Sequence, residues 1–280
     1  MNLLSSKSEI FPTTLQDSNL RLTTHLGIGA HPDDVEIGLY SGIGTCYKHG
    51  TNKVTGVVIT DGATDNKTSI QGMTPEKKAQ ARILELQQAA SVGGYLALIT
   101  LGYTSDEIKR TMQSDIRNDI TSVLEATRPE IVYLHSLFDD HDTHLAASRL
   151  SLEALRELSN VFVPQKVYGC EVTESLDWDP QKIRLDTSMY PEVAEQVLYA
   201  FISQADALRN YPNAALERWG ANAVFDRGNK QGPRKISFAM DLTRLVTDGT
   251  NLEDFIGEKV QEFMLRKKNN LRSTYPADKI

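Results

Sequence analysis

The sequence has only two cysteines, Cys46 and Cys170, among its 280 residues. They are too few for a disulfide scaffold and too far apart for a zinc site built from cysteines. No apolar run approaches the roughly 20 residues that a helix needs to span a membrane. Residues 1–20 also lack the apolar stretch of a secretory signal. We therefore expect a cytoplasmic protein without a membrane span.

Basic residues are scarce relative to acidic ones. The chain has 30 Lys and Arg against 37 Asp and Glu, which gives a formal net charge of -7. Because no basic face compensates, this balance argues against a nucleic-acid partner. The hydrophobic content of 40% and charged content of 24% are typical of a globular protein, and the length allows a sizeable core.

Apolar runs rich in β-branched residues alternate with amphipathic stretches. The runs predict strands over residues 22–28, 53–60, 95–101, 130–135 and 166–172, with an edge strand over 182–186. Helical spacing follows most of them, and later helices are expected over 191–204, 211–225 and 252–263. The alternation predicts an α/β fold with a mostly parallel sheet. We expect a flexible arm over 1–20, one domain over 21–265 and a basic tail over 266–280.

Three polar residues follow the first predicted strand. His31, Asp33 and Asp34 lie at the junction with a helix that begins near Pro32. In open α/β sheets, ligands bind where strands end. A metal ion would take one carboxylate and the neutral imidazole as ligands and leave the second carboxylate facing what the metal binds. The alternative is a simple turn in which Asp33 or Asp34 caps the helix.

A second histidine cluster follows the fourth predicted strand. His141 and His144 lie three residues apart at the start of a helix, so they share one helical face. His135 ends the preceding strand, and we interpret it as a hydrogen-bonded histidine rather than a ligand. Asp139 and Asp140 either cap the helix or orient His141, as carboxylates near metal sites commonly do.

Together the two clusters predict a metal-assisted hydrolase. His31, Asp34 and His144 form a set of two histidines and one carboxylate that suits zinc with open coordination positions, and also ferrous iron. Asp33 would act as general base for a metal-bound water. His141 would stabilise the developing oxyanion or protonate the leaving amine. The bond attacked would be an amide or ester.

The segment Ala30-His31-Pro32-Asp33-Asp34, with a later His-x-x-His, resembles the PIG-L/LmbE-like family of zinc-dependent N-acetylglucosaminyl deacetylases. The resemblance implies a Rossmann-like fold with helices on both faces of the sheet, and homo-oligomers. It also implies the same zinc ligands, base and oxyanion stabiliser. Here the second motif is His141-Asp142-Thr143-His144 in place of the usual His-Pro-Asp-His, and Val35 precedes Glu36, where the first motif usually continues directly with Glu.

The resemblance extends to residues that contact substrate in the family. The segment Thr60-Asp61-Gly62 resembles a substrate loop, Arg82 matches an arginine on the following helix, and Asp106 ends a segment similar to one that binds sugar hydroxyls. Arg227 belongs to a stretch, 227–232, that is similar to a further landmark of the family. We also expect Asp140 to support the histidines from a second layer.

The expected function is therefore zinc-dependent removal of the N-acetyl group from an N-acetylglucosamine-type amino sugar or glycoconjugate. One alternative is an amide hydrolase that acts on a non-sugar substrate. Another is a catalytically silent protein that binds a sugar or metabolite. A dinucleotide-binding domain is disfavoured because Pro32 takes the place of the third glycine of that motif, and no acidic residue ends the second strand in the required place.

Overall fold

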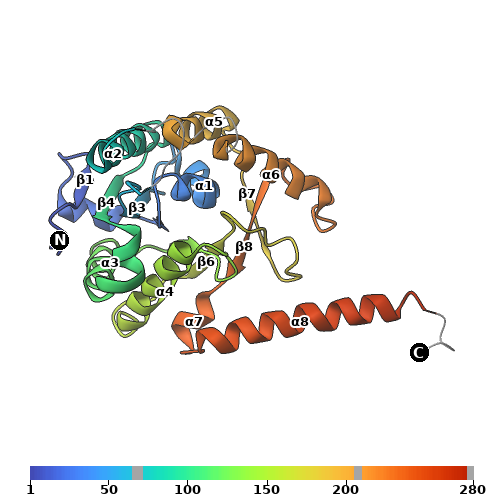
Figure 1. Cartoon of the computed structure of the whole chain (residues 1–280). Coiled ribbons are helices and arrows are strands. Elements are labelled where there is room, and N and C mark those ends of the chain that lie inside the picture. Colours follow the sequence, from blue (N-terminus) through green and yellow to red (C-terminus); the bar gives the residue numbers. More distant parts are fainter. Residues whose placement is uncertain (65–71, 205–209, 276–280) are drawn as a thin grey trace.

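The computed structural model describes residues 1–64, 72–204 and 210–275, and its centre is a sheet of eight strands in the order β1-β4-β3-β2-β5-β6-β8-β7 (Figure 1). The five strands from β4 to β6 are parallel, whereas β1 and β8 pair antiparallel with β4 and β6, and β7 pairs antiparallel with β8. The strands are β1 Glu9–Phe11, β2 His25–Gly29, β3 Val54–Thr60, β4 Ala97–Tyr103, β5 Ile131–His135, β6 Lys166–Cys170, β7 Ile183–Asp186 and β8 Ile236–Asp241.

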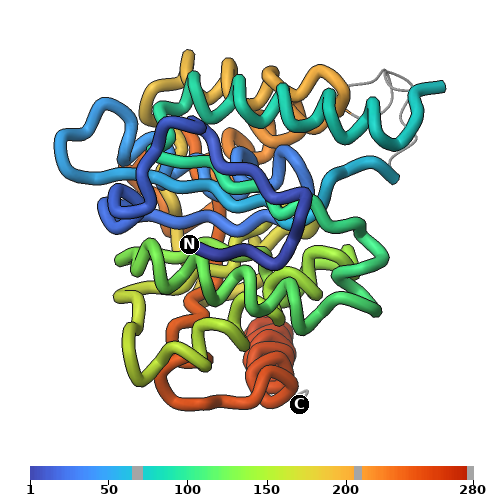
Figure 2. Tube along the Cα trace, turned by 90° about the vertical axis from the view of Figure 1, so that its left-hand side faces the viewer, coloured from blue at the N-terminus to red at the C-terminus, as the bar shows by residue number. Residues whose placement is uncertain are grey.

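Helices cover both faces of this sheet (Figures 1 and 2). The helices are α1 Asp34–Cys46, α2 Pro75–Gly93, α3 Gln113–Thr127, α4 Asp142–Glu157, α5 Pro191–Tyr199, α6 Tyr211–Phe225, α7 Thr243–Thr247 and α8 Leu252–Arg272. Short helical turns lie at Asp17–Leu22, Glu107–Thr111 and Ile202–Gln204. None of the helices in the described ranges is long and apolar enough to cross a membrane.

The alternation of side chains along β3 explains the two layers. Val57 packs in a core with α3 and α4, and its neighbour Val58 packs in a second core with α1, α2 and α5. A strand that is buried on both faces is apolar throughout, which is why β3 appears in the sequence as a continuous β-branched run. The predicted fold class, a mostly parallel α/β sheet with helices on both faces, is confirmed.

The two ends of the chain differ from the sequence expectation. Residues 1–20 were expected to form a flexible arm, yet Glu9–Phe11 pairs with the edge of β4, and Leu20 is completely buried. At the other end, α8 continues to Arg272 and so includes half of the expected basic tail. The strand Ile236–Asp241 was not predicted, because it lies beyond the last clear β-α alternation and is fixed by long-range pairing with β6 and β7.

The buried carboxylate of Glu36 in α1 makes the stability of this packing depend on pH. Glu36 is completely buried, and its Oε1 accepts a hydrogen bond from the Tyr95 hydroxyl at 2.8 Å. Its Oε2 has no hydrogen-bond partner among the described residues. Burial raises the pKa of Glu36 from 4.5 to about 7, against the opposing effect of the Tyr95 hydrogen bond.

We therefore expect Glu36→Gln to flatten the pH dependence of the free energy of unfolding. Because the folded protein holds this proton more tightly than the unfolded chain, the contribution of Glu36 to stability is fully present below pH 4.5 and is lost as the pH rises through about 7. The pKa shift corresponds to about 3 kcal/mol of the free energy of unfolding. The wild type loses this amount as the pH rises, whereas the variant, whose side chain does not ionise, does not. Urea denaturation of both proteins at several pH values measures this difference. Parallel pH profiles would contradict it.

Candidate metal and catalytic site

The two histidine clusters lie at the carboxyl ends of adjacent strands. β2 and β5 pair in parallel, and the chain leaves them through α1 and α4, which cover opposite faces of the sheet. The neighbours of β2 and β5 on their outer sides are β3 and β6, so the strand order reverses between them. Such a switch point opens a crevice in which α/β proteins bind ligands.

The turn after β2 holds Asp33 in a strained backbone conformation. Its φ of 96° and ψ of -22° lie in the left-handed region, which residues other than glycine rarely adopt. Asp33 precedes α1 without capping it by a side-chain hydrogen bond, and the residue is 6% exposed. The amide nitrogen of Gln204 lies 3.5 Å from its Oδ1. Strain of this kind typically persists at functional sites, where the surrounding structure enforces it.

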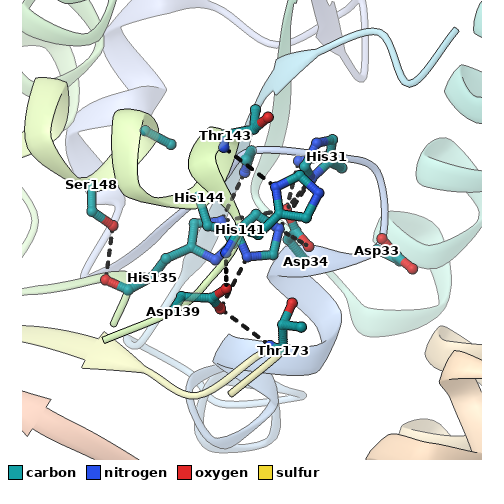
Figure 3. Close-up of polar contacts among 12 residues, drawn as sticks. His31, Asp33, Asp34, His135, Asp139, His141, Thr143, His144, Ser148 and Thr173 are labelled. Atoms are coloured by element: carbon teal, nitrogen blue, oxygen red, sulfur yellow. Dashed lines mark hydrogen bonds and ion pairs between the residues drawn. The ribbon is translucent and has the colours of Figure 1, made fainter. Parts of the chain in front are cut away.

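Three electron-pair donors converge in front of this turn (Figure 3). His31 Nδ1 lies 3.1 Å from His144 Nε2 and 3.3 Å from Asp34 Oδ2, and His144 Nε2 lies 3.4 Å from Asp34 Oδ1. In a tetrahedral zinc site with bonds of roughly 2.0–2.1 Å, ligand atoms are about 3.3 Å apart. The spacing of these donors therefore fits one zinc-sized cation.

Asp139 fixes the orientation of one of these imidazoles. Its Oδ2 lies 3.1 Å from His144 Nδ1, and its Oδ1 accepts the backbone N–H of His141 at 2.9 Å. A proton on Nδ1 of His144 leaves the lone pair of Nε2 facing His31 and Asp34. This is the carboxylate–histidine arrangement found behind metal ligands.

The charges agree with a cation-binding set. Burial disfavours the ionised form of Asp34, but the nearby His144 and His135 hold its pKa well below the usual range. Burial likewise lowers the pKa of His144, yet Asp34 and Asp139 outweigh it and raise the value. Positive charge is thus favoured at the centre of the cluster even without a metal.

His141 has a different environment from His144. As the N-cap of α4, its Nδ1 accepts the backbone N–H of Thr143 at 3.3 Å. The neutral ring then carries its proton on Nε2 and can donate it. Burial, followed by the nearby His144 and His31, lowers the pKa of His141, which favours this neutral form. The side chain is exposed, and its ring centroid lies 4.8 Å from that of His31.

His135 lies behind the cluster as a fourth histidine. Its Nε2 accepts the backbone N–H of Ala30 at 2.9 Å and lies 3.3 Å from Asp34 Oδ2. Its ring stacks on His144 with centroids 4.0 Å apart, and burial lowers its pKa to about 4. Ligand atoms of Asp34, His135 and His144 lie within 4.8 Å of one another, so this triplet is a second candidate set. The set with His31 is favoured because the lone pair of His135 Nε2 is already used.

A cavity of about 630 Å³ opens in front of the donors. His31, Asp33, Asp34, His141 and His144 all line it. Its other walls include Lys109, beside the turn after β4, and Arg218 and Trp219 from α6. No motif in the sequence marks any of these three residues. Lys109 belongs to the short helical turn after β4, and α6 begins only at Tyr211, well after α4 ends at Glu157.

The four predicted substrate residues lie outside the described lining of this cavity. Arg82 is 1% exposed and lies 3.9 Å from Glu85, and Asp106 is exposed beside Arg110. Asp61 faces a separate cavity between α2 and the N-terminal segment. Arg227 is exposed in the loop after α6. Each of these predictions rests on local sequence resemblance, which does not determine the direction of a side chain.

The supporting carboxylate also differs from the expected one. Asp140 is exposed, whereas its neighbour Asp139 is 2% exposed and makes the contact with His144. Both residues lie in an irregular turn between β5 and α4, where no periodicity shows which of them points inward. The Oδ2 of Asp139 also accepts the backbone N–H of Thr173 at 3.2 Å, which joins this turn to the segment after β6.

We expect Asp139→Asn to weaken metal binding by about 10–100-fold, as loss of such a partner usually does. Asparagine keeps the volume but removes the charge that holds the proton on His144 Nδ1. Titration with zinc in the presence of a competing chelator measures the affinity. An affinity equal to that of the wild type would show that Asp139 does not act through His144.

The fold and the donor set define an α/β protein with a cluster of histidines and carboxylates that could hold a metal ion at a topological switch point. Residues 26–155 match the family model described as PIG-L: GlcNAc-PI de-N-acetylase. This match supports the resemblance to the PIG-L/LmbE-like family noted in the sequence. No curated protein matches the chain.

Several solved structures share the fold. The conserved protein TT1542 from Thermus thermophilus has 21% identity and a TM-score of 0.61, with 78% of this chain and 94% of that chain covered. The N,N'-diacetylchitobiose deacetylase from Pyrococcus horikoshii has 19% identity and a TM-score of 0.61, covering 83% and 88%. GalB, the 4-carboxy-2-hydroxymuconate hydratase from Pseudomonas putida, has 19% identity and a TM-score of 0.60, covering 79% and 95%. A deacetylase and a hydratase share this architecture, so the fold alone does not determine the reaction.

Proposed function

We propose that the protein is a metal-dependent N-deacetylase that acts on an N-acetylglucosamine-type amino sugar or glycoconjugate. The observation that carries this proposal is the convergence of three donor groups, His31, Asp34 and His144, whose nearest ligand atoms lie 3.1–3.4 Å apart, beside the buried carboxylate of Asp33 and the exposed imidazole of His141. The family model, whose description names a de-N-acetylase, supports the reaction class. We also propose a single α/β domain and a cytoplasmic location.

We propose His31, Asp34 and His144 as the ligands of a zinc ion, with ferrous iron as the alternative metal. Bound there, the metal would lower the pKa of a water toward about 7 and polarise the acetyl carbonyl. The protein's part is to hold these donors in place. The carboxylate of Asp139 does so through His144, and the backbone N–H of His31, which donates to Asp34 Oδ2 at 2.6 Å, fixes the carboxylate.

Asp33 is proposed as the general base. It lines the cavity next to Asp34, and its backbone has the left-handed conformation described above. Its carboxylate would take the proton of the attacking water and pass it toward the amine. Burial of Asp33 limits access of bulk water to this transfer. General bases of this kind contribute about 10²–10⁴-fold to the rate.

His141 is proposed as the group that meets the developing negative charge. Its Nδ1 is engaged with Thr143, so Nε2 carries the proton that can be donated. From one helical turn before His144, its Nε2–H would donate a hydrogen bond to the developing oxyanion, while the proton for the leaving amine comes from Asp33. Another wall of the cavity is Arg218, whose guanidinium donates to the carbonyls of Val172 and Thr173 at 2.7 and 3.0 Å and is thereby held in place for polar groups of a sugar.

Release of acetate tests this function. Protein purified without chelator and reconstituted with zinc is incubated with N-acetylglucosamine and with its β-glycosides, and acetate and free amine are measured. We expect equal amounts of both, lost on removal of the metal and restored by zinc. Sugar binding without acetate release would favour a catalytically silent binding protein. Release of acetate from N-acetyl amines that are not sugars would instead favour a general amide hydrolase.

A further inference from the structure

The helix α8, Leu252–Arg272, extends away from the rest of the molecule (Figure 1). One side of it packs on the protein. Phe255 and Lys259 are buried, and Phe263 makes an edge contact with Trp178 at 5.6 Å between ring centroids. These three inward residues are four apart, so they define a single face of the helix.

A second side of α8 is apolar but exposed. Val260, Met264 and Leu271 are 48%, 47% and 58% exposed. A Cβ placed on Gly257 would meet no atom within 4 Å, so this position is open as well. With Lys267, these residues follow one another at alternating steps of three and four, which is the spacing of a coiled-coil seam. We call residues 257, 260, 264, 267 and 271 the α8 stripe.

The charges of α8 are divided between its two halves. The first half carries Glu253, Asp254, Glu258 and Glu262, and its one lysine, Lys259, is buried against Asp179. The second half carries Arg266, Lys267, Lys268 and Arg272 and no acidic residue. A parallel pair of such helices would place like charges side by side. An antiparallel pair places the acidic half of each helix along the basic half of the other.

We propose that the α8 stripe binds a second copy of this chain, with the two α8 helices antiparallel about a two-fold axis near Gln261. In this arrangement Val260 packs against Met264 of the second copy. Asp254 and Lys268, two heptads apart, share the same position beside the stripe, so each lies next to the other residue of the opposite copy. The contact is isologous and closes as a dimer.

A membrane surface fits these observations less well. Amphipathic helices that lie on anionic lipid carry basic residues along their polar face. Here only the second half of α8 is basic, and the acidic first half would be repelled by the same lipid. The split of charge therefore favours a partner that has both signs, which a second α8 has.

Sedimentation velocity of the full chain tests the apolar part of the contact. At about 1–100 µM, where interfaces of modest area dissociate, we expect a monomer–dimer equilibrium. Met264→Lys should weaken dimerisation at least about tenfold, because it places a charge in the seam. Leu265→Lys is the matched control, since Leu265 is 59% exposed but lies on another side of the helix, and it should leave the dimer unchanged.

Charge reversal tests the antiparallel register. Asp254→Lys and Lys268→Asp each create two repulsive pairs and should each weaken the dimer about tenfold, whereas the double variant should restore it. Asp254 and Lys268 are both exposed, so we expect these charge variants to fold even if Met264→Lys does not. A monomer at every concentration, or a dimer insensitive to Met264→Lys, would overturn the proposal. Binding to phosphatidylserine vesicles by a protein that stays monomeric would overturn it in favour of a membrane.

Discussion

Asp33→Asn is expected to reduce kcat for acetate release by about 10²–10⁴-fold while the metal content stays at the wild-type level. Asparagine has nearly the same volume and tolerates the left-handed backbone at this position better than other residues do, so the turn should survive. What it cannot do is accept the proton of the attacking water. The effect should therefore fall on kcat rather than on metal or substrate binding.

The matched control for this prediction is Asp142→Asn. Asp142 is an exposed carboxylate in the first turn of α4, next to His141, and it lines no part of the cavity. We expect near wild-type turnover from it. Metal content by plasma mass spectrometry and acetate release under saturating substrate are measured on both variants. Normal turnover by Asp33→Asn would show that another group removes the proton.

His144→Ala is expected to abolish metal binding, and His31→Ala should do the same. Each variant removes one of the three proposed protein ligands, so the loss of affinity should exceed the roughly 10–100-fold typical of a supporting residue such as Asp139. By contrast, His141→Ala should keep the metal and lose turnover. Competition with a chromophoric chelator measures the zinc affinity of each variant.

The same measurement separates the two candidate donor sets. In His135→Gln, the side-chain carbonyl can still accept the backbone N–H of Ala30, so we expect this variant to fold. If His31 is the ligand, His135→Gln retains zinc and His31→Ala does not. The reverse pattern would assign the metal to Asp34, His135 and His144 and would leave His31 as a cavity residue.

The local part of the site was predictable from the sequence. His31, Asp33 and Asp34 fall within one turn, and the rule that parallel strands end at the same edge of a sheet brings His144 next to them. The order of the strands, which places β5 beside β2, is a tertiary property. Without this strand order, the sequence shows only two separate histidine clusters. The pairing of β5 with β2 brings His31 Nδ1 and His144 Nε2 to 3.1 Å from each other.

The walls of the cavity were not predictable in the same way. Trp219 and Arg218 come from α6, which follows β7 and α5 in the chain and whose position depends on its packing against β8. Asp139 rather than Asp140 faces His144, and the irregular turn that contains both residues has no periodicity from which this could be predicted. Local resemblance pointed to Arg82, whose side chain is buried beside Glu85.

The central claim is that one metal ion is held by His31, Asp34 and His144. Anomalous diffraction at the zinc edge from crystals of the reconstituted full chain tests it most directly. We expect one strong peak within about 2.0–2.3 Å of His31 Nδ1, an oxygen of Asp34 and His144 Nε2. A map without a peak in this crevice, or with a peak bonded to His135 instead of His31, would contradict it.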